Sequence, residues 1–201
     1  ESGRALVAYY SILLFNILDV TRFHTEPLPP RMPEDCPAPL EYMYQALQDL
    51  TIRNIQEVLN DAIFYRDETR RLFQNGQISL RERSLAEQLF WTTISEINRL
   101  AKELKNPNPE LTDLDRVLSD FYYCNFSVFQ SLPDSWAIGQ LFPIMPIHRL
   151  NEEPTRKGIL ADITCDCDGK IDKFIDKRGV RRYLPLHELK PYEEYILGVF
   201  M

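Results

Sequence analysis

A proline-rich segment constrains this chain more than any other feature of its sequence. Between residues 21 and 39 the chain carries Pro27, Pro29, Pro30, Pro33, Pro37 and Pro39. Proline lacks an amide hydrogen and fixes its φ angle, so neither a helix nor a strand ladder tolerates so many prolines. The sequence therefore predicts an extended linker here, with differently folded regions on its two sides.

The regions on the two sides differ in their apolar pattern. Residues 1–20 are rich in Val, Ile, Leu, Phe and Tyr but lack helix caps and a helical stripe, which predicts one or two buried strands. From about residue 40 to residue 104, apolar residues recur at intervals of three and four, as do Ile52, Ile55, Val58, Leu59, Ala62 and Ile63. This spacing is typical of long amphipathic helices in a solvated bundle.

Local signals predict where these helices begin and end. Asn75 followed by Gly76 indicates a helix stop, and Ser79 with Glu82 three residues later indicates a capping box for the next helix. We expect that helix to end near residue 105. A shorter helix should open at residues 112–115 and close near residue 119.

After residue 120 the pattern returns to short apolar segments between turns. Strands are expected at residues 121–128, 141–149, 159–164, 170–175 and 195–201, with turns at residues 133–134, 151–154, 168–169 and 177–179. The predicted fold class is therefore α+β, a barrel-like or sandwich-like β domain interrupted by a helical bundle. In this division residues 1–39 hold the first strands and the linker, residues 40–120 the helical insertion, and residues 121–201 the remainder of the β domain.

The composition allows a folded core and disfavours two classes of partner. Apolar residues make up 44% of the 201 residues, and 30 acidic against 23 basic side chains give a net charge of −7. That sign is wrong for binding nucleic acid or an anionic membrane. The most apolar stretch, residues 5–18, is shorter than the roughly 20 residues that a membrane span needs, and no signal peptide precedes it. We therefore expect a cytoplasmic protein whose four cysteines are reduced.

The densest cluster of reactive side chains lies at residues 162–169, which hold two thiols and three carboxylates. Strand alternation would place Cys165 and Cys167 on one face and Asp166 and Asp168 on the other. A Cys-x-Cys pair without a second cluster of Cys or His is a weak zinc signal. The competing interpretation is a tight hairpin in which Cys165 is buried and the acidic side chains cap the turn.

Two other short motifs combine charge with a special neighbour. Glu1 and Arg4 flank Gly3, and such a set can bind a phosphate, although an exposed ion pair is the commoner role. Asp134 and Trp136 could receive a cationic ligand, or could be a turn former and a core residue. The three histidines have no convincing catalytic partner, and the glycine-rich nucleotide motifs and the nucleophile elbow are absent from the sequence.

At these motifs the chain resembles the biosynthetic arginine decarboxylases, pyridoxal-phosphate enzymes of the alanine racemase fold type. The resemblance includes Asp-Ile-Thr-Cys-Asp-Cys-Asp-Gly-Lys-Ile at residues 162–171 and Leu-Pro-Asp-Ser-Trp-Ala at residues 132–137. It extends over residues 1–5, 123–138, 141–154, 162–171, 184–187 and 195–200, with a looser similarity in the helical middle. It implies an N-terminal (β/α) barrel that holds the cofactor lysine, followed by a β domain with a helical insertion. This chain is similar to the C-terminal portion only, and the cofactor-binding barrel is missing from it.

The resemblance also implies roles for individual residues. Glu1 would hold the pyridine nitrogen protonated, Gly3 would let the backbone approach, and Arg4 would bind the cofactor phosphate. Cys165 would protonate the α-carbon after decarboxylation, and Asp166 would contact the distal cationic group of the substrate. In this family that cysteine reaches the cofactor of the partner subunit, which implies a homodimer or a dimer of dimers.

Further expectations concern the substrate and the metal. We add Asp134 as a second contact to the guanidinium group, by analogy with a loop acid in ornithine enzymes. The implied reaction converts L-arginine to agmatine and CO2 for polyamine synthesis. The alternatives are a relative that acts on ornithine, lysine or another amino acid, and a non-catalytic subunit that lacks the barrel. The family uses magnesium, to which no residue here is assigned. One departure is Cys167, where the family usually has Ser.

Overall fold

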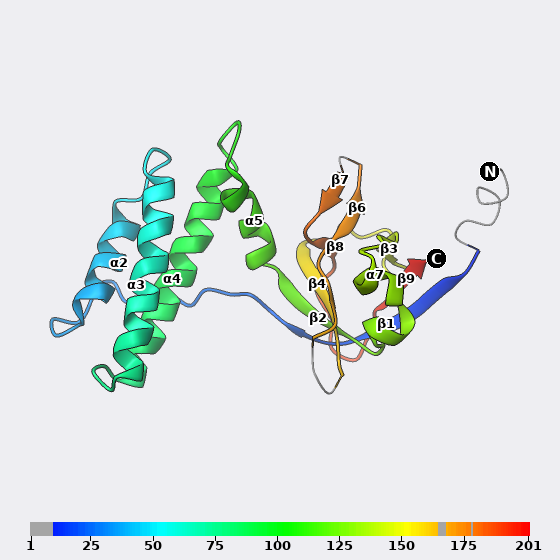
Figure 1. Ribbon diagram of the computed structural model, residues 1–201, viewed down its shortest axis with the longest axis horizontal. Coiled ribbons are helices and arrows are strands. Elements are labelled where there is room, and N and C mark those ends of the chain that lie inside the picture. The colour runs from blue at the N-terminus through cyan, green and yellow to red at the C-terminus, as the bar shows by residue number, and fades with distance from the viewer. Residues whose placement is uncertain (1–9, 165–167, 178) are drawn as a thin grey trace. The chain divides into compact units, whose positions relative to one another are not determined.

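The computed structural model describes residues 10–164, 168–177 and 179–201, and its contacts divide the chain into two compact units. The first unit consists of Glu1–Phe23 and Asp115–Met201, and the second of His24–Leu114 (Figure 1). The proline-rich segment is thus grouped with the helices and not with the first strand.

The helical unit is built on three helices that lie side by side (Figure 1). They are α2 (Ala38–Gln48), α3 (Ile55–Gln74) and α4 (Leu80–Ala101), and α3 packs against both of the others. Each helix buries one stripe, as the sequence predicted. The buried apolar residues of the three helices include Leu40, Met43, Ile55, Val58, Leu59, Ala62, Ala86, Leu89, Phe90, Ile94 and Ile97. Ile52 and Ile63, which the pattern placed in the same stripe, are instead 39% and 40% exposed.

The predicted helix stop and start around residue 76 are confirmed. Gly76 adopts a left-handed φ of 70°, and the amides of Gly76 and Gln77 donate to the carbonyls of Phe73 and Leu72, at 3.0 and 2.9 Å. This is the Schellman arrangement that glycine permits. Ser79 and Glu82 form the capping box: the Ser79 hydroxyl accepts from the Glu82 amide, and the Glu82 carboxylate accepts from the Ser79 amide at 2.6 Å.

The next two predicted helix ends were wrong by three or four residues. Helix α4 ends at Ala101 and not near residue 105, and α5 (Pro109–Val117) begins before Thr112. The amide of Leu111 donates to the Asn108 side chain at 2.9 Å. Asn108 therefore caps the helix, and Pro109 occupies its first position, where a missing amide hydrogen costs nothing.

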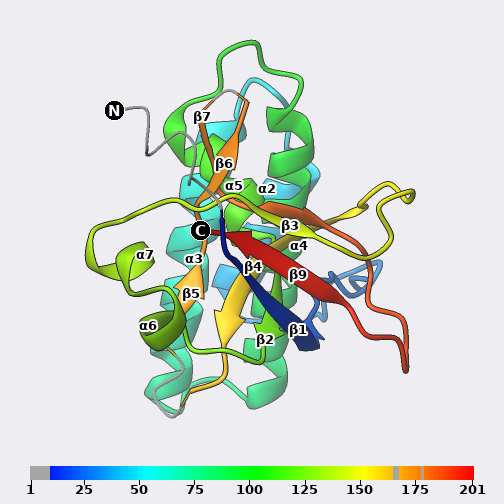
Figure 2. The same ribbon diagram turned by 90° about the vertical axis from the view of Figure 1, so that its right-hand side faces the viewer.

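The other unit is built on a seven-stranded sheet with the order β3-β9-β1-β2-β4-β5, in which β8 also pairs with β4 (Figure 2). Its strands are β1 (Ile12–Thr21), β2 (Asp120–Cys124), β3 (Ile144–Pro146), β4 (Arg156–Asp162), β5 (Lys170–Ile171), β8 (Leu184–Leu186) and β9 (Ile196–Phe200). Among the strand pairs that the structure describes in this sheet, β2 and β4 pair in parallel and the others are antiparallel. Strands β6 (Phe174–Asp176) and β7 (Gly179–Arg181) form a separate hairpin.

The core of this unit lies on one face of the sheet, and alternate residues of each strand supply it. On β1 the core residues are Phe15 and Ile17, whereas Ile12, Leu14 and Leu18 are about half exposed. The first strand is therefore buried on one side only, which differs from the expectation for residues 1–20. The predicted fold class is confirmed: a helical bundle combined with a barrel-like, mainly antiparallel sheet, without a (β/α) barrel among the described residues.

The segment after β2 departs most from the strand pattern. The strand predicted over residues 121–128 ends at Cys124, and α6 (Val128–Ser131) follows because the Ser127 hydroxyl accepts from the Gln130 amide. The turn predicted at residues 133–134 is the first turn of α7 (Pro133–Ala137), where proline occupies an N-terminal helix position. Gly179, predicted as a turn residue, is the first residue of β7.

Candidate active site

The parallel strands β2 and β4 bring two candidate segments to the same edge of the sheet. In their register Cys124, the last residue of β2, lies opposite Asp162, the last residue of β4. The chain after β2 continues into α6 and α7, which carry Asp134, and the chain after β4 continues into the segment of Cys165 and Asp166. Since parallel strands end at the same edge, both segments start from one place.

Asp162 joins these two segments through its side chain. Its exposed fraction is 2%, and its carboxylate accepts from the Val128 amide at 2.9 Å and from the Thr164 hydroxyl at 3.3 Å. Its own amide donates to the Gly169 carbonyl at 2.8 Å. A buried carboxylate needs such donors, because leaving one unsatisfied costs free energy.

Gly169, at the end of the motif at residues 162–169, leaves the space that the Asp162 side chain occupies. A Cβ atom built on Gly169 would overlap the Asp162 carboxylate, and all three of its nearest atoms belong to that group. Only glycine fits there without displacing the carboxylate. The chain returns to the sheet at this point, where Lys170 pairs with Ala161.

A pocket of about 470 Å³ opens beside Asp162. Three of its lining residues, Phe121, Tyr123 and Ala161, alternate with the core residues Tyr122 and Leu160 and therefore lie on the opposite face of the sheet, whereas Asp162 lies on the core face at the end of β4. The lining consists of Phe121, Tyr123, Ala161, Asp162, Ile163, Gly169 and Lys170. A mainly apolar hollow of this size with a few polar groups is typical of a small-molecule site. Tyr123 contributes a polar group to this pocket, and its hydroxyl lies 3.2 Å from the hydroxyl of Thr21 on β1.

Asp134 and Trp136 lie on α7, and the side chains of both are exposed. The backbone carbonyl of Asp134 accepts from the amides of Ile138 and Gln140, at 3.3 and 2.9 Å. Trp136 is 58% exposed and meets Phe129 edge to face, with ring centroids 5.4 Å apart. Trp136 is therefore not a core residue, and Asp134 is a surface carboxylate that a cationic ligand could reach.

The remaining candidate residues, Glu1, Gly3, Arg4, Cys165 and Asp166, lie outside the described residues, as does Cys167. Asp168 is described and exposed. In the part of the chain that the structure describes, no cluster of three or more His, Cys, Asp or Glu side chains could hold a metal ion.

Cys124 differs chemically from a catalytic cysteine, although it lies near this edge. Its thiol is fully buried and faces the core, and burial raises its pKa well above the ordinary value. The thiol group donates a weak hydrogen bond to the Tyr122 carbonyl. A thiol in such surroundings stays protonated and unreactive at neutral pH.

The buried histidine, His187, belongs to a structural network. Its Nε2 lies 3.0 Å from the Glu152 carbonyl and its Nδ1 lies 2.7 Å from the Tyr195 hydroxyl. A carbonyl only accepts, so Nε2 carries the hydrogen and Nδ1 accepts from Tyr195. The Tyr122 hydroxyl donates to the His187 carbonyl at 2.9 Å. These bonds tie β2 to the chain after β8.

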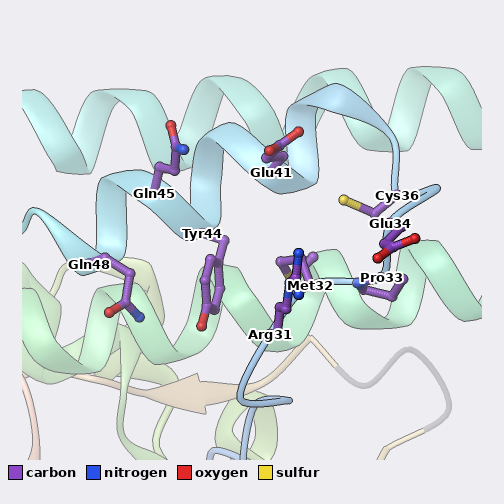
Figure 3. Close-up of a pocket in the computed structure, with 9 residues that line it drawn as sticks. All are labelled: Arg31, Met32, Pro33, Glu34, Cys36, Glu41, Tyr44, Gln45 and Gln48. Carbon is purple, nitrogen blue, oxygen red and sulfur yellow. The ribbon is translucent and has the colours of Figure 1, made fainter.

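A second pocket, of about 400 Å³, lies in the helical unit where the proline-rich segment meets α2 (Figure 3). It contains Cys36, Glu41 and Tyr44, whose hydroxyl donates to the Pro30 carbonyl at 3.1 Å. Burial, and then the charges of Glu41 and Glu82, raise the pKa of Cys36. The pocket therefore offers no activated thiol.

Sequence reasoning missed the role of Asp162 and the pocket beside it. The motif at residues 162–169 predicts a cluster of three carboxylates, but it does not indicate that Asp162 differs from Asp166 and Asp168. The signal that could have found it is the strand alternation on β4, which places Asp162 on the same face as the core residue Leu160. A carboxylate on a core face needs hydrogen-bond donors.

Comparisons with known proteins support one family. Residues 33–115 match the family model described as the arginine decarboxylase helical bundle domain. Over its whole length the chain is 48% identical to the biosynthetic arginine decarboxylase of Gloeobacter violaceus and 46% identical to that of Bacteroides thetaiotaomicron. This chain resembles a portion of the biosynthetic arginine decarboxylases. The resemblance given by its motifs is thus confirmed.

A solved structure supports the same conclusion at the level of the fold. The crystal structure of the biosynthetic arginine decarboxylase from Campylobacter jejuni matches 94% of this chain with a TM-score of 0.70 and 32% identity. The chain covers 29% of that structure, and it spans about a third of the length of the two curated relatives, 31% and 32%. None of the helices that the structure describes combines the length and apolar character needed to cross a bilayer.

Proposed function

We propose that this chain is part of a pyridoxal-phosphate-dependent decarboxylase that converts L-arginine to agmatine and CO2 in polyamine biosynthesis. The observation that carries this proposal is the similarity along the entire chain, at 48% and 46% identity, to proteins named biosynthetic arginine decarboxylase. The match of residues 33–115 to the helical bundle domain supports it, because that description also names arginine decarboxylase. The barrel and its lysine belong, in this proposal, to the longer protein.

The residues proposed to hold the cofactor have suitable chemistry. When bound, pyridoxal phosphate supplies an electron sink for the negative charge left on the α-carbon as CO2 departs. The carboxylate of Glu1 would keep the ring nitrogen protonated, and the guanidinium of Arg4 would bind the phosphate in the bidentate way that arginine allows. Gly3 between them would let the backbone come close.

The proton and the substrate require other residues. Cys165 would deliver the proton to the α-carbon, since correct placement of this proton decides whether an amine forms. Asp166 and Asp134 would bind the guanidinium group of arginine. The exposed position of Asp134 on α7, and its start from the same sheet edge as the segment of Asp166, support this pairing. We also propose a cytoplasmic homodimer or dimer of dimers in which Cys165 acts on the cofactor of the partner subunit.

The test is amine formation by the full-length gene product, supplied with pyridoxal phosphate and offered L-arginine, L-ornithine and L-lysine together. Agmatine as the dominant product is expected. Another amine would keep the chemistry and contradict the proposed contacts of Asp134 and Asp166. No amine from a cofactor-loaded protein would instead favour a non-catalytic subunit. A parallel assay without magnesium tests whether the metal that the family implies is needed.

A further inference from the structure

The strongest unexplained group in the described residues is the buried carboxylate of Asp162. Asp120, at the other end of the β2–β4 pair, is equally buried, but it is neutralised by Arg156 at 2.7 Å. The described contacts of the Asp162 side chain are instead hydrogen bonds, from the Val128 amide and the Thr164 hydroxyl. Burying a carboxylate costs free energy that hydrogen bonds offset only in part, so the contacts of Asp162 indicate that this position requires a fixed geometry.

The partners of Asp162 belong to two different segments. Val128 is the first residue of α6, six positions before Asp134, and Thr164 directly precedes Cys165 and Asp166. At the far end of the second segment, Gly169 accepts from the Asp162 amide and leaves room for its carboxylate. One side chain therefore touches both segments to which the proposed function assigns substrate contacts.

We propose that Asp162 is a positioning residue that sets the segment of Cys165 and Asp166 against the segment of Asp134. This inference rests on the proposed function. In this proposal Asp162 contacts neither the substrate nor the cofactor, and it acts through its hydrogen bonds with Thr164 and Val128. Its contacts join Thr164, the residue before Cys165, to Val128, the first residue of α6, and we expect delivery of the proton to depend on this link.

The proposal predicts a change in product as well as in rate. With the thiol in place, the proton goes to the α-carbon and agmatine leaves. If the proton goes to the cofactor carbon instead, hydrolysis with one water releases 4-guanidinobutanal and leaves the cofactor as pyridoxamine phosphate. A misplaced thiol should therefore raise the fraction of aldehyde. A displacement of about 1 Å is enough to lower a rate about 100-fold.

The experiment compares Asp162→Ala with Asp120→Ala in the full-length holoenzyme. Both variants remove a buried carboxylate from the same pair of strands, so both should lower the melting temperature. Only Asp162→Ala should lower kcat for agmatine about 100-fold and raise the aldehyde fraction. Asp162→Asn should restore most of the activity, because its amide oxygen can accept from Val128 while its NH2 group donates to Thr164. Equal kcat and equal product ratios for the two alanine variants would overturn the proposal.

Hydrogen exchange measured by mass spectrometry gives a readout that is independent of turnover. Asp162→Ala should speed exchange in both peptides 127–134 and 163–170, and Asp120→Ala in neither. Exchange that rises in only one of the two peptides would contradict the coupling. If Asp162→Ala does not fold, Thr164→Val removes one of the two contacts and should speed exchange in peptide 163–170 and raise the aldehyde fraction. Should the wild-type protein make no amine, the proposed function fails, and the exchange measurement still decides whether Asp162 couples the segments.

Discussion

Arg156 binds the buried carboxylate of Asp120 through two hydrogen bonds, 2.7 Å from Nε to Oδ2 and 2.8 Å from Nη2 to Oδ1. The same carboxylate accepts from the Phe23 amide at 2.8 Å. Asp120 begins the register of the parallel β2–β4 pair, opposite Gly158, and Asp162 ends it. Each end of this pair thus carries a buried carboxylate, one held by a guanidinium group and the other by hydrogen bonds between segments.

Replacing Arg156 by Met should destabilise the β unit strongly. The change leaves the Asp120 carboxylate, 2% exposed, without its cation, and an uncompensated buried charge costs about 3–5 kcal/mol. The free energy of opening of β2 and β4, measured by hydrogen exchange in the full-length protein, checks this value. The matched control is Arg99→Met on α4, whose ion pair with Glu96 is exposed and screened by solvent, so this change should lower the free energy of unfolding far less. Equal effects of the two changes would contradict this account of Asp120.

Gly169→Ala should destabilise the segment that returns to β5, because the new methyl group overlaps the Asp162 carboxylate. Overpacking of this kind costs about 1–3 kcal/mol. In the double variant with Asp162→Ala the overlap disappears, so the two changes should be clearly less than additive. Gly139→Ala serves as the control, since Gly139 has a φ of 69° but no heavy atom lies within 4 Å of where its Cβ would be, chain neighbours aside. It should lose stability through backbone strain alone and show additivity with Asp162→Ala.

The capping box of α4 should make the start of that helix sensitive to acid. Hydrogen bonds from the side chain and then the backbone of Ser79 lower the pKa of Glu82. A lowered pKa in the folded state gives stability that is complete above the unfolded pKa and is lost as the pH falls through the folded one. Protection of peptide 79–90 against hydrogen exchange should therefore fall between about pH 5 and pH 3.

Two variants separate the charge of Glu82 from the cap itself. Glu82→Gln keeps a hydrogen-bond acceptor, so protection at pH 7 should change little while the loss on acidification becomes smaller. Ser79→Ala removes the cap and should cost about 0.5–2 kcal/mol of helix stability at neutral pH. An identical acid dependence in wild type and Glu82→Gln would show that another group is responsible.

Much of the helical unit could be predicted from the sequence because its signals are local. Gly76, Ser79 and Glu82 determine a helix end and a helix start within seven residues, and the stripe of α3 repeats at helical spacing. The start of α5 at Pro109 was harder to predict, because both Asn108 and Thr112 are residue types that cap helices. The structure shows that Asn108 is the cap, through one hydrogen bond from the Leu111 amide.

The candidate site was less predictable because it depends on pairing between distant strands. Nothing local in the sequence shows that β2 and β4 are parallel neighbours, and this pairing places Asp162 within reach of Val128. The residues carried over from the family resemblance, Cys165 and Asp166 among them, could be named from their motif alone. The role of the Asp162 carboxylate could be found only once the pairing of β2 with β4 was known, because its hydrogen bond with the Val128 amide joins residues 34 positions apart.

Arg4→Ala in the full-length protein should weaken cofactor retention before it affects chemistry. The guanidinium group is proposed to bind the phosphate, and removing one strong charge-assisted contact of this kind should release the cofactor during gel filtration. The absorbance of the cofactor relative to protein measures its retention. With saturating pyridoxal phosphate, much of the agmatine formation should return. Arg22→Ala, which removes an exposed ion pair with Glu188, is the control and should retain the cofactor as wild type does.

Cys165→Ala should show the reverse pattern, with full cofactor retention and a loss of amine. A positioned general acid contributes about 100-fold to 10,000-fold, so agmatine formation should fall by at least about 100-fold. Cys124→Ala is the matched control: its thiol faces the core with a raised pKa, and its removal should change stability but leave kcat intact. Equal agmatine formation by wild type and Cys165→Ala would remove the catalytic role of Cys165. Because Asp162 is proposed to act by placing this thiol, adding Asp162→Ala to Cys165→Ala should lower kcat little further.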